Sequence, residues 1–338
     1  MKRMVLPFVI LPLCFALTAC GGNEQPERKT ITAMDTVVTL TAYGANAAQA
    51  IDEAEEEIFR LDRELSRANE NGDIYPLNKN GAGNVSDETA YVINTALEIC
   101  DSTDGAFDIT VAPVMDLWGF FGRNYRVPDA NELQEGLKRV SYRNIEIENN
   151  SITLRNNAML DLGGIAKGYA SDKLTEVFKN NKIKSALISF GSAIQAIGNK
   201  PDGQKWRIGI ADPKKSNDYI ALLELKDKCI ATSGSYEQVF EENGQRYHHI
   251  IDPKTGYPAN NGLASVSVIC DNAARADALS TALFVMGMDK AAEYYRDNGG
   301  FDLVFVTDDD TIYYTGGIED SLSIPGGVNV EKFKIERQ

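Results

Sequence analysis

The feature that most constrains the fold is a run of short strand-like segments in the middle of the chain. They are residues 185–197, 206–211, 219–225, 229–232, 247–251 and 263–269. Because these strands follow one another with no helix between them, while helical patterns flank the run, the order of elements favours an α+β fold over a doubly wound sheet. We therefore predict mixed or antiparallel sheets packed against helices.

The flanking helices are predicted from apolar periodicity. Apolar residues recur at spacings of three and four from Ile51 to Leu65, which indicates a helix over residues 46–69. Ser86 is the expected N-cap of a second helix. Other helices are expected over residues 165–180, 273–286 and 290–297, and a strand over 31–43. No linker rich in Pro, Gly or Ser divides the chain, so residues 31–338 are predicted to form one compact domain.

Residues 1–19 are expected to be an export signal. Lys2 and Arg3 precede an almost wholly apolar stretch at residues 4–19, which is shorter than the roughly 20 residues of a membrane-spanning helix. Residues 17–20 read Leu-Thr-Ala-Cys, similar to a bacterial lipobox in which Cys20 carries the lipid. A signal peptide cleaved elsewhere is the alternative. Residues 20–30 would then tether an exported, periplasm-facing domain to a membrane.

Charge and cysteine usage exclude several functions. The chain has 49 acidic and 34 basic residues, a net charge of −15, which argues against nucleic-acid binding. A phosphate ligand remains possible because bound Mg²⁺ can reverse the local sign. Cys100, Cys229 and Cys270 lie far apart after the leader and form no Cys-x-x-Cys pair, so neither zinc binding nor thioredoxin-like chemistry is expected.

The first candidate site lies within the predicted helix 273–286. Asp277, Ser280 and Thr281 fall on one face of that helix. A carboxylate with two hydroxyls suits Mg²⁺, which takes few protein ligands and leaves positions for substrate phosphates. The alternative is a solvated polar face. Because the neighbouring residues are apolar, we expect Asp277 to be buried and therefore to need a partner or a metal.

Two further segments could carry chemistry. Residues 161–170 read Asp-Leu-Gly-Gly-Ile-Ala-Lys-Gly-Tyr-Ala, a strand, a Gly pair and a helix that could bring backbone amides and Lys167 to a phosphate. A Gly-mediated turn with a surface lysine is the alternative. His248 and His249 are adjacent, so on a strand they point to opposite faces and one of them could serve as a general acid or base in a pocket.

Together these segments resemble one family, the FAD:protein FMN transferases, or ApbE-like periplasmic lipoproteins. The resemblance runs from about Ile31 to the C-terminus and rests on eight motifs in the family's order. They are residues 33–36, 104–110, 117–120, 161–170, 206–213, 231–236, 249–256 and 276–281.

The resemblance implies a set of site residues. For Mg²⁺ it implies the side chains of Asp277 and Thr281 and the carbonyl of Ala170, with Ser280 at a position where some members carry a further Asp. For the FAD site it implies Met34, Ala106, Phe107, Asp108, Lys167, Lys173 and Ile251. Two departures stand out: Ala68 occupies a position where the family usually stacks an aromatic ring, and residues 191–193 read Gly-Ser-Ala instead of Gly-Gly-Asn.

The activity implied is Mg²⁺-dependent cleavage of the FAD pyrophosphate, with transfer of FMN to a Thr or Ser hydroxyl of an exported protein and release of AMP. His249 is our predicted base, Asp277 the second candidate, and Lys167 would add positive charge near the phosphates. The implied acceptors are membrane redox-complex subunits of the Na⁺-translocating NADH:quinone reductase or Rnf type. An FAD pyrophosphatase, which uses water instead, and a flavin-binding lipoprotein without turnover are the alternatives.

Overall fold

The computed structural model describes residues 25–215, 218–326 and 331–336. The predicted signal and the lipidation site at Cys20 lie outside these residues. Within them, no helix combines the length and apolar character that crossing a bilayer requires.

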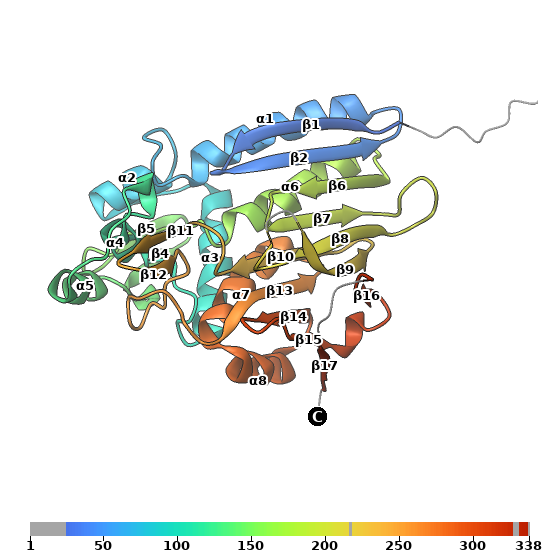
Figure 1. Ribbon diagram of the computed structural model, residues 1–338. Helices are drawn as coiled ribbons and strands as arrows, with labels where there is room; N and C mark the ends of the chain where they lie inside the picture. The colour runs from blue at the N-terminus through green and yellow to red at the C-terminus, as the bar shows by residue number, and fades with distance from the viewer. Residues whose placement is uncertain (1–24, 216–217, 327–330, 337–338) are drawn as a thin grey trace, which may run out of the picture.

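A nine-stranded sheet forms the centre of the molecule and runs from β1 at the top of Figure 1 to β17 at the bottom. Its order is β1-β2-β6-β7-β10-β13-β14-β15-β17, and every neighbouring pair is antiparallel except β15 and β17. The strands are β1 (Glu27–Ala33), β2 (Thr36–Tyr43), β6 (Ser185–Ser189), β7 (Ala193–Ile197), β10 (Cys229–Gly234), β13 (Leu263–Cys270), β14 (Asp302–Thr307), β15 (Ile312–Thr315) and β17 (Lys332–Ile335).

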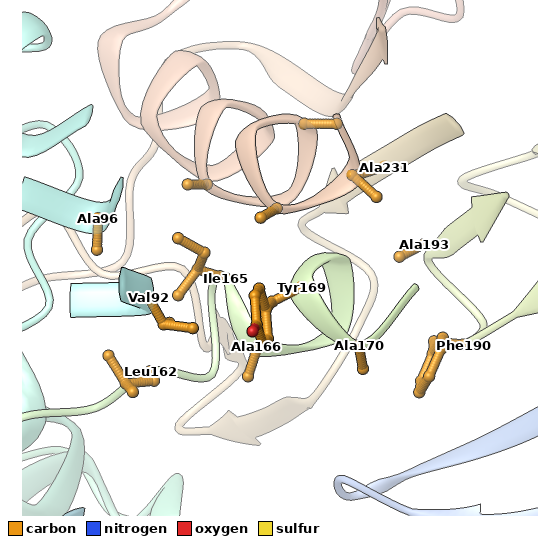
Figure 2. Close-up of a cluster of buried hydrophobic side chains, with 14 of the residues drawn as sticks. Val92, Ala96, Leu162, Ile165, Ala166, Tyr169, Ala170, Phe190, Ala193 and Ala231 are labelled. Carbon is orange, nitrogen blue, oxygen red and sulfur yellow. The ribbon is translucent and has the colours of Figure 1, made fainter. Parts of the chain in front are cut away.

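Helices cover one face of this sheet. α1 packs on β1 and β2, α6 on β6 and β7, and α7 on β10 and β13, while α6 also contacts both α1 and α7. α3 and α8 pack on α7 in the same layer. The helices of this layer are α1 (Ala47–Leu65), α3 (Asp87–Ser102), α6 (Ala166–Asn180), α7 (Ala273–Met286) and α8 (Met288–Asn298). Their apolar faces and that of the sheet form one core, part of which is drawn in Figure 2.

The other face of the sheet is covered by three strands, β8 (Trp206–Ala211), β9 (Tyr219–Leu225) and β16 (Leu322–Ser323). Residues of β8 are alternately buried and exposed, so Trp206, Ile208 and Ile210 point into a second core with Val304 and Val306 of β14. Every residue of β13 is buried, as expected for a strand with both faces covered.

A third, aromatic cluster lies beside the end of the sheet. It is built from α4 (Ala112–Trp118), α5 (Ala130–Leu137) and the hairpin β11 (Val239–Glu242)–β12 (Gln245–His248). The Trp118 ring packs 5.1 Å from that of Tyr247, and its indole N–H donates to the Gly256 carbonyl at 2.8 Å. The remaining elements are α2 (Ile74–Asn80), β3 (Ala82–Asn84), β4 (Ile145–Glu148), β5 (Ser151–Leu154), η1 (Phe121–Arg123), η2 (Tyr142–Asn144) and η3 (Gly316–Ile318).

The predicted α+β class, with mixed sheets packed against helices, is confirmed. The strand expected over residues 31–43 is wrong, because the chain turns at Met34 and Asp35, where φ is 52° and 57°, and the two halves pair as β1 and β2. β1 also begins at Glu27, so residues 27–30 belong to the folded domain and not to the expected tether. The Ser86 hydroxyl accepts from the Thr89 N–H, as a helix N-cap does.

Candidate active site

A cavity of about 410 Å³ opens where the start of α6, the middle of α7 and the end of β10 meet the β1–β2 turn. It is lined by residues from segments far apart in the sequence. Among the predicted site residues these are Met34, Ala106, Phe107, Asp108, Lys167, His249, Ile251, Asp277 and Thr281. The structure therefore brings most of the predicted site together.

One glycine in the first turn of α6 explains how the end of this cavity near Lys167 and Asp277 is built. A Cβ on Gly168 would lie 2.1 Å from the Ala273 carbonyl oxygen, so only glycine lets α6 and α7 approach this closely. The Gly168 N–H donates to Asp277 Oδ2 at 2.9 Å, and Lys167 Nζ lies 3.8 Å from the same oxygen. The close contact between the helices thus holds Asp277 at the cavity wall.

α7 carries both Asp277 and Thr281, and both line the cavity as predicted. Asn272 caps the helix by accepting from the Arg275 N–H at 2.7 Å, and Asp277 is 6% exposed. The Thr281 hydroxyl lies 3.1 Å from that of Ser233 on β10. Ser280 does not line the cavity, because its hydroxyl is buried behind Ser233 at 2.9 Å and donates to the Asp277 carbonyl.

The carbonyl that the resemblance implies for Mg²⁺ belongs to Ala170, and its role stays a prediction. Ala170 is fully buried inside α6 and does not line the cavity, and Figure 2 shows it among the side chains of the apolar core. Gly164 lines the cavity close to Thr281, since a Cβ added to Gly164 would lie 3.7 Å from Thr281 Oγ1.

The donor set fits Mg²⁺. In the described part of the chain no three His, Cys, Asp or Glu side chains gather to hold a metal, so zinc-like ligation is not available there. The carboxylate of Asp277 and the hydroxyl of Thr281 at the cavity offer oxygen ligands only. Mg²⁺ prefers such a set when substrate phosphates complete its shell.

His249 is the histidine that faces the cavity. Its Nδ1 lies 3.1 Å from the Glu237 carbonyl oxygen, so Nδ1 carries the proton and Nε2 is left as an acceptor. Burial lowers the pKa of His249 to about 4, which keeps the ring neutral near pH 7. His248 points the other way and pairs with the Ala259 carbonyl at 2.9 Å. The two rings are opposed as predicted, but the expected strand over residues 247–251 is wrong, because β12 ends at His248.

Lys173 is the exception among the residues expected at the FAD site. It lies at a second cavity on the outer side of α6 and pairs with Glu176 at 2.8 Å. Lys173 lies six positions after Lys167 in α6, a rotation of roughly 240°, so the two side chains point to different faces of the helix. Its implied role at the FAD site stays a prediction.

Asp108 lines the cavity but is held by the protein itself. Its Oδ1 accepts from the Thr110 N–H and hydroxyl, and its Oδ2 accepts from the Tyr142 N–H at 2.8 Å. Burial raises the pKa of Asp108 although these hydrogen bonds oppose the rise. We conclude that Asp108 shapes the 106–108 loop.

Among the cavity residues that were not predicted as site residues are Ser233, which lies in the 231–236 motif, Glu237 and Phe121. The Ser233 hydroxyl lies next to that of Thr281. Glu237 lines the cavity, and burial raises the pKa of its carboxyl while the positive charge of Lys167 opposes the rise. Phe121 lines the opposite wall, with the Arg67 guanidinium 3.9 Å from its ring centroid. Neither Glu237 nor Phe121 belongs to a periodic or Gly-rich pattern, so no local signal pointed to them.

Comparisons with known proteins agree with this geometry. Residues 34–305 match the model of the ApbE family. The FAD:protein FMN transferase of Treponema pallidum is 30% identical, with 94% of each chain covered, and that of Haemophilus influenzae is 32% identical, covering 88% of this chain and 91% of its own.

Solved structures are similar as well. The ApbE protein of Thermotoga maritima superposes with a TM-score of 0.80 at 35% identity, covering 85% of this chain and 96% of its own. The flavin transferase ApbE of Vibrio cholerae has a TM-score of 0.79 at 27% identity, covering 88% and 99%. Fold, site and sequence therefore agree that the chain belongs to the ApbE family.

Proposed function

We propose that this protein is a Mg²⁺-dependent FAD:protein FMN transferase. It would cleave the FAD pyrophosphate, join FMN to a Thr or Ser hydroxyl of another protein and release AMP. The observation that carries the proposal is the meeting of Asp277, Thr281 and Lys167 with a neutral His249 around one cavity. The names of the relatives, which are FAD:protein FMN transferases, support the same activity.

Asp277 and Thr281 are the side chains that would hold Mg²⁺, with the carbonyl of Ala170 as the implied main-chain ligand. When bound, the ion would neutralise charge on the pyrophosphate as its P–O bond breaks. Lys167 lies beside this set, donating to the Gly163 carbonyl at 2.9 Å, and can turn its ammonium group to a phosphate oxygen. Ser233 fixes the Thr281 hydroxyl from the neighbouring strand.

His249 is suited to remove the acceptor hydroxyl's proton. Its ring is oriented by the Glu237 carbonyl and by the edge of Phe120, whose centroid lies 6.4 Å away. A bound pyrophosphate would raise the pKa of His249 from about 4, because the protonated ring is stabilised by nearby negative charge. Asp277 remains the second candidate, although its Oδ2 already accepts from Gly168.

The apolar end of the cavity supports a flavin ring as the ligand. Phe107, Phe120 and Phe121 line it together with Met34 and Met115. A planar aromatic ligand gains stacking and burial against such side chains.

The test is incubation of the protein with FAD, Mg²⁺ and a candidate acceptor, followed by mass spectrometry of the acceptor. We expect the acceptor to gain FMN at a Thr or Ser, and AMP to appear in equal amount. Rapid release of FMN without any acceptor would instead identify an FAD pyrophosphatase, and FAD that stays intact for hours would leave a flavin-binding protein.

We also propose that the protein is exported and lipid-anchored through Cys20, facing the periplasm, with acceptors among membrane redox-complex subunits of the Na⁺-translocating NADH:quinone reductase or Rnf type. The leader pattern of residues 1–20 supports this proposal. Labelling cells with a radioactive fatty acid should mark the full chain but not the Cys20→Ala variant. Equal labelling of both would refute the anchor.

A further inference from the structure

Two cysteines that are far apart in the sequence lie opposite each other on neighbouring strands of the central sheet. Cys229 begins β10 and Cys270 ends β13, and the two are direct partners in the antiparallel register. Figure 1 shows β10 and β13 side by side. Residues directly opposite each other in such a pair point to the same face of the sheet.

The spacing of this pair suits a covalent bond between the sulfurs. Facing Cα atoms in an antiparallel pair lie roughly 4.5–5.5 Å apart, within the roughly 4.4–6.8 Å spanned by disulfides. In the thiol form the Cys229 thiol donates to the Cys270 carbonyl at 3.0 Å, so its sulfur already points at the partner residue. The Cys270 thiol turns aside to the Asn272 carbonyl, also at 3.0 Å.

Burial determines when such a bond could form. Cys229 is 1% exposed and Cys270 is 4% exposed, so neither sulfur can be reached by a bulky reagent in the folded protein. Hydrogen bonding to Cys270 and burial also raise the pKa of the Cys229 thiol well above its usual value. Exchange would therefore occur while the sheet assembles, and the product would then be shielded from reductants.

The pair also connects two parts of the candidate active site. β10 continues from Cys229 to Thr232 and Ser233, which line the cavity. β13 ends at Cys270, and two residues later Asn272 caps α7, the helix that carries Asp277 and Thr281. A bond between the cysteines would join the strand and the helix that together hold the site.

We propose that Cys229 and Cys270 form an intramolecular disulfide when the chain folds in contact with an oxidised dithiol carrier. One cysteine thiolate attacks the carrier's disulfide to give a mixed disulfide and one carrier thiol. The second cysteine then displaces the remaining carrier sulfur. Both cysteines are oxidised, the carrier is reduced to two thiols, and the two cysteine protons end on those thiols.

The experiment is a peptide map of the full chain refolded from denaturant with oxidised and reduced glutathione. Free thiols are alkylated in denaturant before trypsin is added. Cleavage after Lys228, Arg246, Lys254 and Arg275 places Cys229 and Cys270 on separate peptides, residues 229–246 and 255–275. We expect these peptides to be joined, with a mass two hydrogens below their sum, and Cys100 to be alkylated.

Recovery of both peptides singly alkylated from protein that melts cooperatively would overturn the proposal. So would a bond from either cysteine to Cys100. This readout uses the unaltered chain and does not depend on flavin transfer, so it can fail or succeed independently of the proposed function.

A thermal measurement supplies the matched control. The oxidised chain should melt on the order of 5 °C above the reduced chain, because the bond restricts the unfolded state. Cys229→Ser and Cys270→Ser should abolish this difference, whereas Cys100→Ala, which alters a buried cysteine outside the pair, should keep it. A difference that survives in Cys229→Ser would contradict the assignment.

Discussion

Replacing Gly168 by alanine tests how the two helices of the site are held together. Helix propensity alone predicts a gain of about 1 kcal/mol, since glycine is the poorer helix former. The structure predicts the opposite sign. The added Cβ would lie 2.1 Å from the Ala273 carbonyl oxygen and 2.8 Å from the Ala274 Cα, and neither atom can rotate away.

The magnitude follows from the distance. Ordinary contact begins near 3.4 Å, so α6 must move away from α7 by about 1.3 Å. Overpacking of this kind costs about 1–3 kcal/mol, enough to outweigh the gain in propensity. The same movement breaks the hydrogen bond from the Gly168 N–H to Asp277 Oδ2, and a misplacement of about 1 Å at a reacting centre can cost ~10²-fold in rate.

The assay compares Gly168→Ala with Gly136→Ala by thermal melting and by Mg²⁺-dependent FMN transfer. Gly136 also lies in a helix, α5, but the one short contact of its added Cβ would be with the Leu117 Cδ1 methyl at 2.7 Å, which can rotate. We expect Gly168→Ala to melt on the order of 2–3 °C lower and to lose transfer, and Gly136→Ala to stay close to the unaltered chain in both. A Gly168→Ala protein that melts higher and keeps its activity would refute the close-contact argument.

Three further predictions concern individual side chains. Asp277→Asn should keep the fold, because the amide oxygen can still accept from Gly168, but should lose at least ~10²-fold in Mg²⁺-dependent transfer; an unchanged rate would exclude Asp277 as a ligand. Since the pKa of His249 is lowered to about 4 in the fold, the unfolded state binds more protons between about pH 6.5 and 4, so stability should fall by on the order of 3 kcal/mol as the pH drops through this window. Comparing denaturant unfolding of the unaltered chain and His249→Gln at pH 7 and pH 4.5 checks this, because the variant should lose less stability. Lys173→Ala should transfer FMN at the unaltered rate, because this lysine pairs with Glu176 outside the cavity; a rise in the KM for FAD would restore its implied role.

Elements whose residues carry their own periodicity or cap were predictable. The helix expected over 273–286 is α7 with the same bounds, and the helix expected over 165–180 is α6 one residue shorter. The run of strands in the middle of the chain correctly indicated α+β, because local hydrophobic alternation and turns decide which segments become strands.

Elements that depend on distant contacts were not predictable in the same way. The position of α4 depends on such a contact, because its Trp118 is held by the Gly256 carbonyl far along the chain. The hairpin at Met34 and Asp35 needs two residues with left-handed backbone conformation, and the sequence has no glycine at either position to indicate it. Lys167, Ala170 and Lys173 lie on the same helix, yet Lys167 alone of the three lines the cavity, because the packing of α6 against α7 decides which of its residues face it.

Residue order was sufficient to indicate the class of fold, the helix that carries Asp277 and Thr281, and a histidine opposed to its neighbour, because each follows from spacing along one element. The sequence did not indicate which groups meet in the site, because α6, α7 and β10 are far apart along the chain and are brought together only by tertiary packing. Gly168 allows the helices to touch, and this contact places Asp277 beside Lys167 at the cavity wall. Packing between elements, which no local pattern records, decided that arrangement.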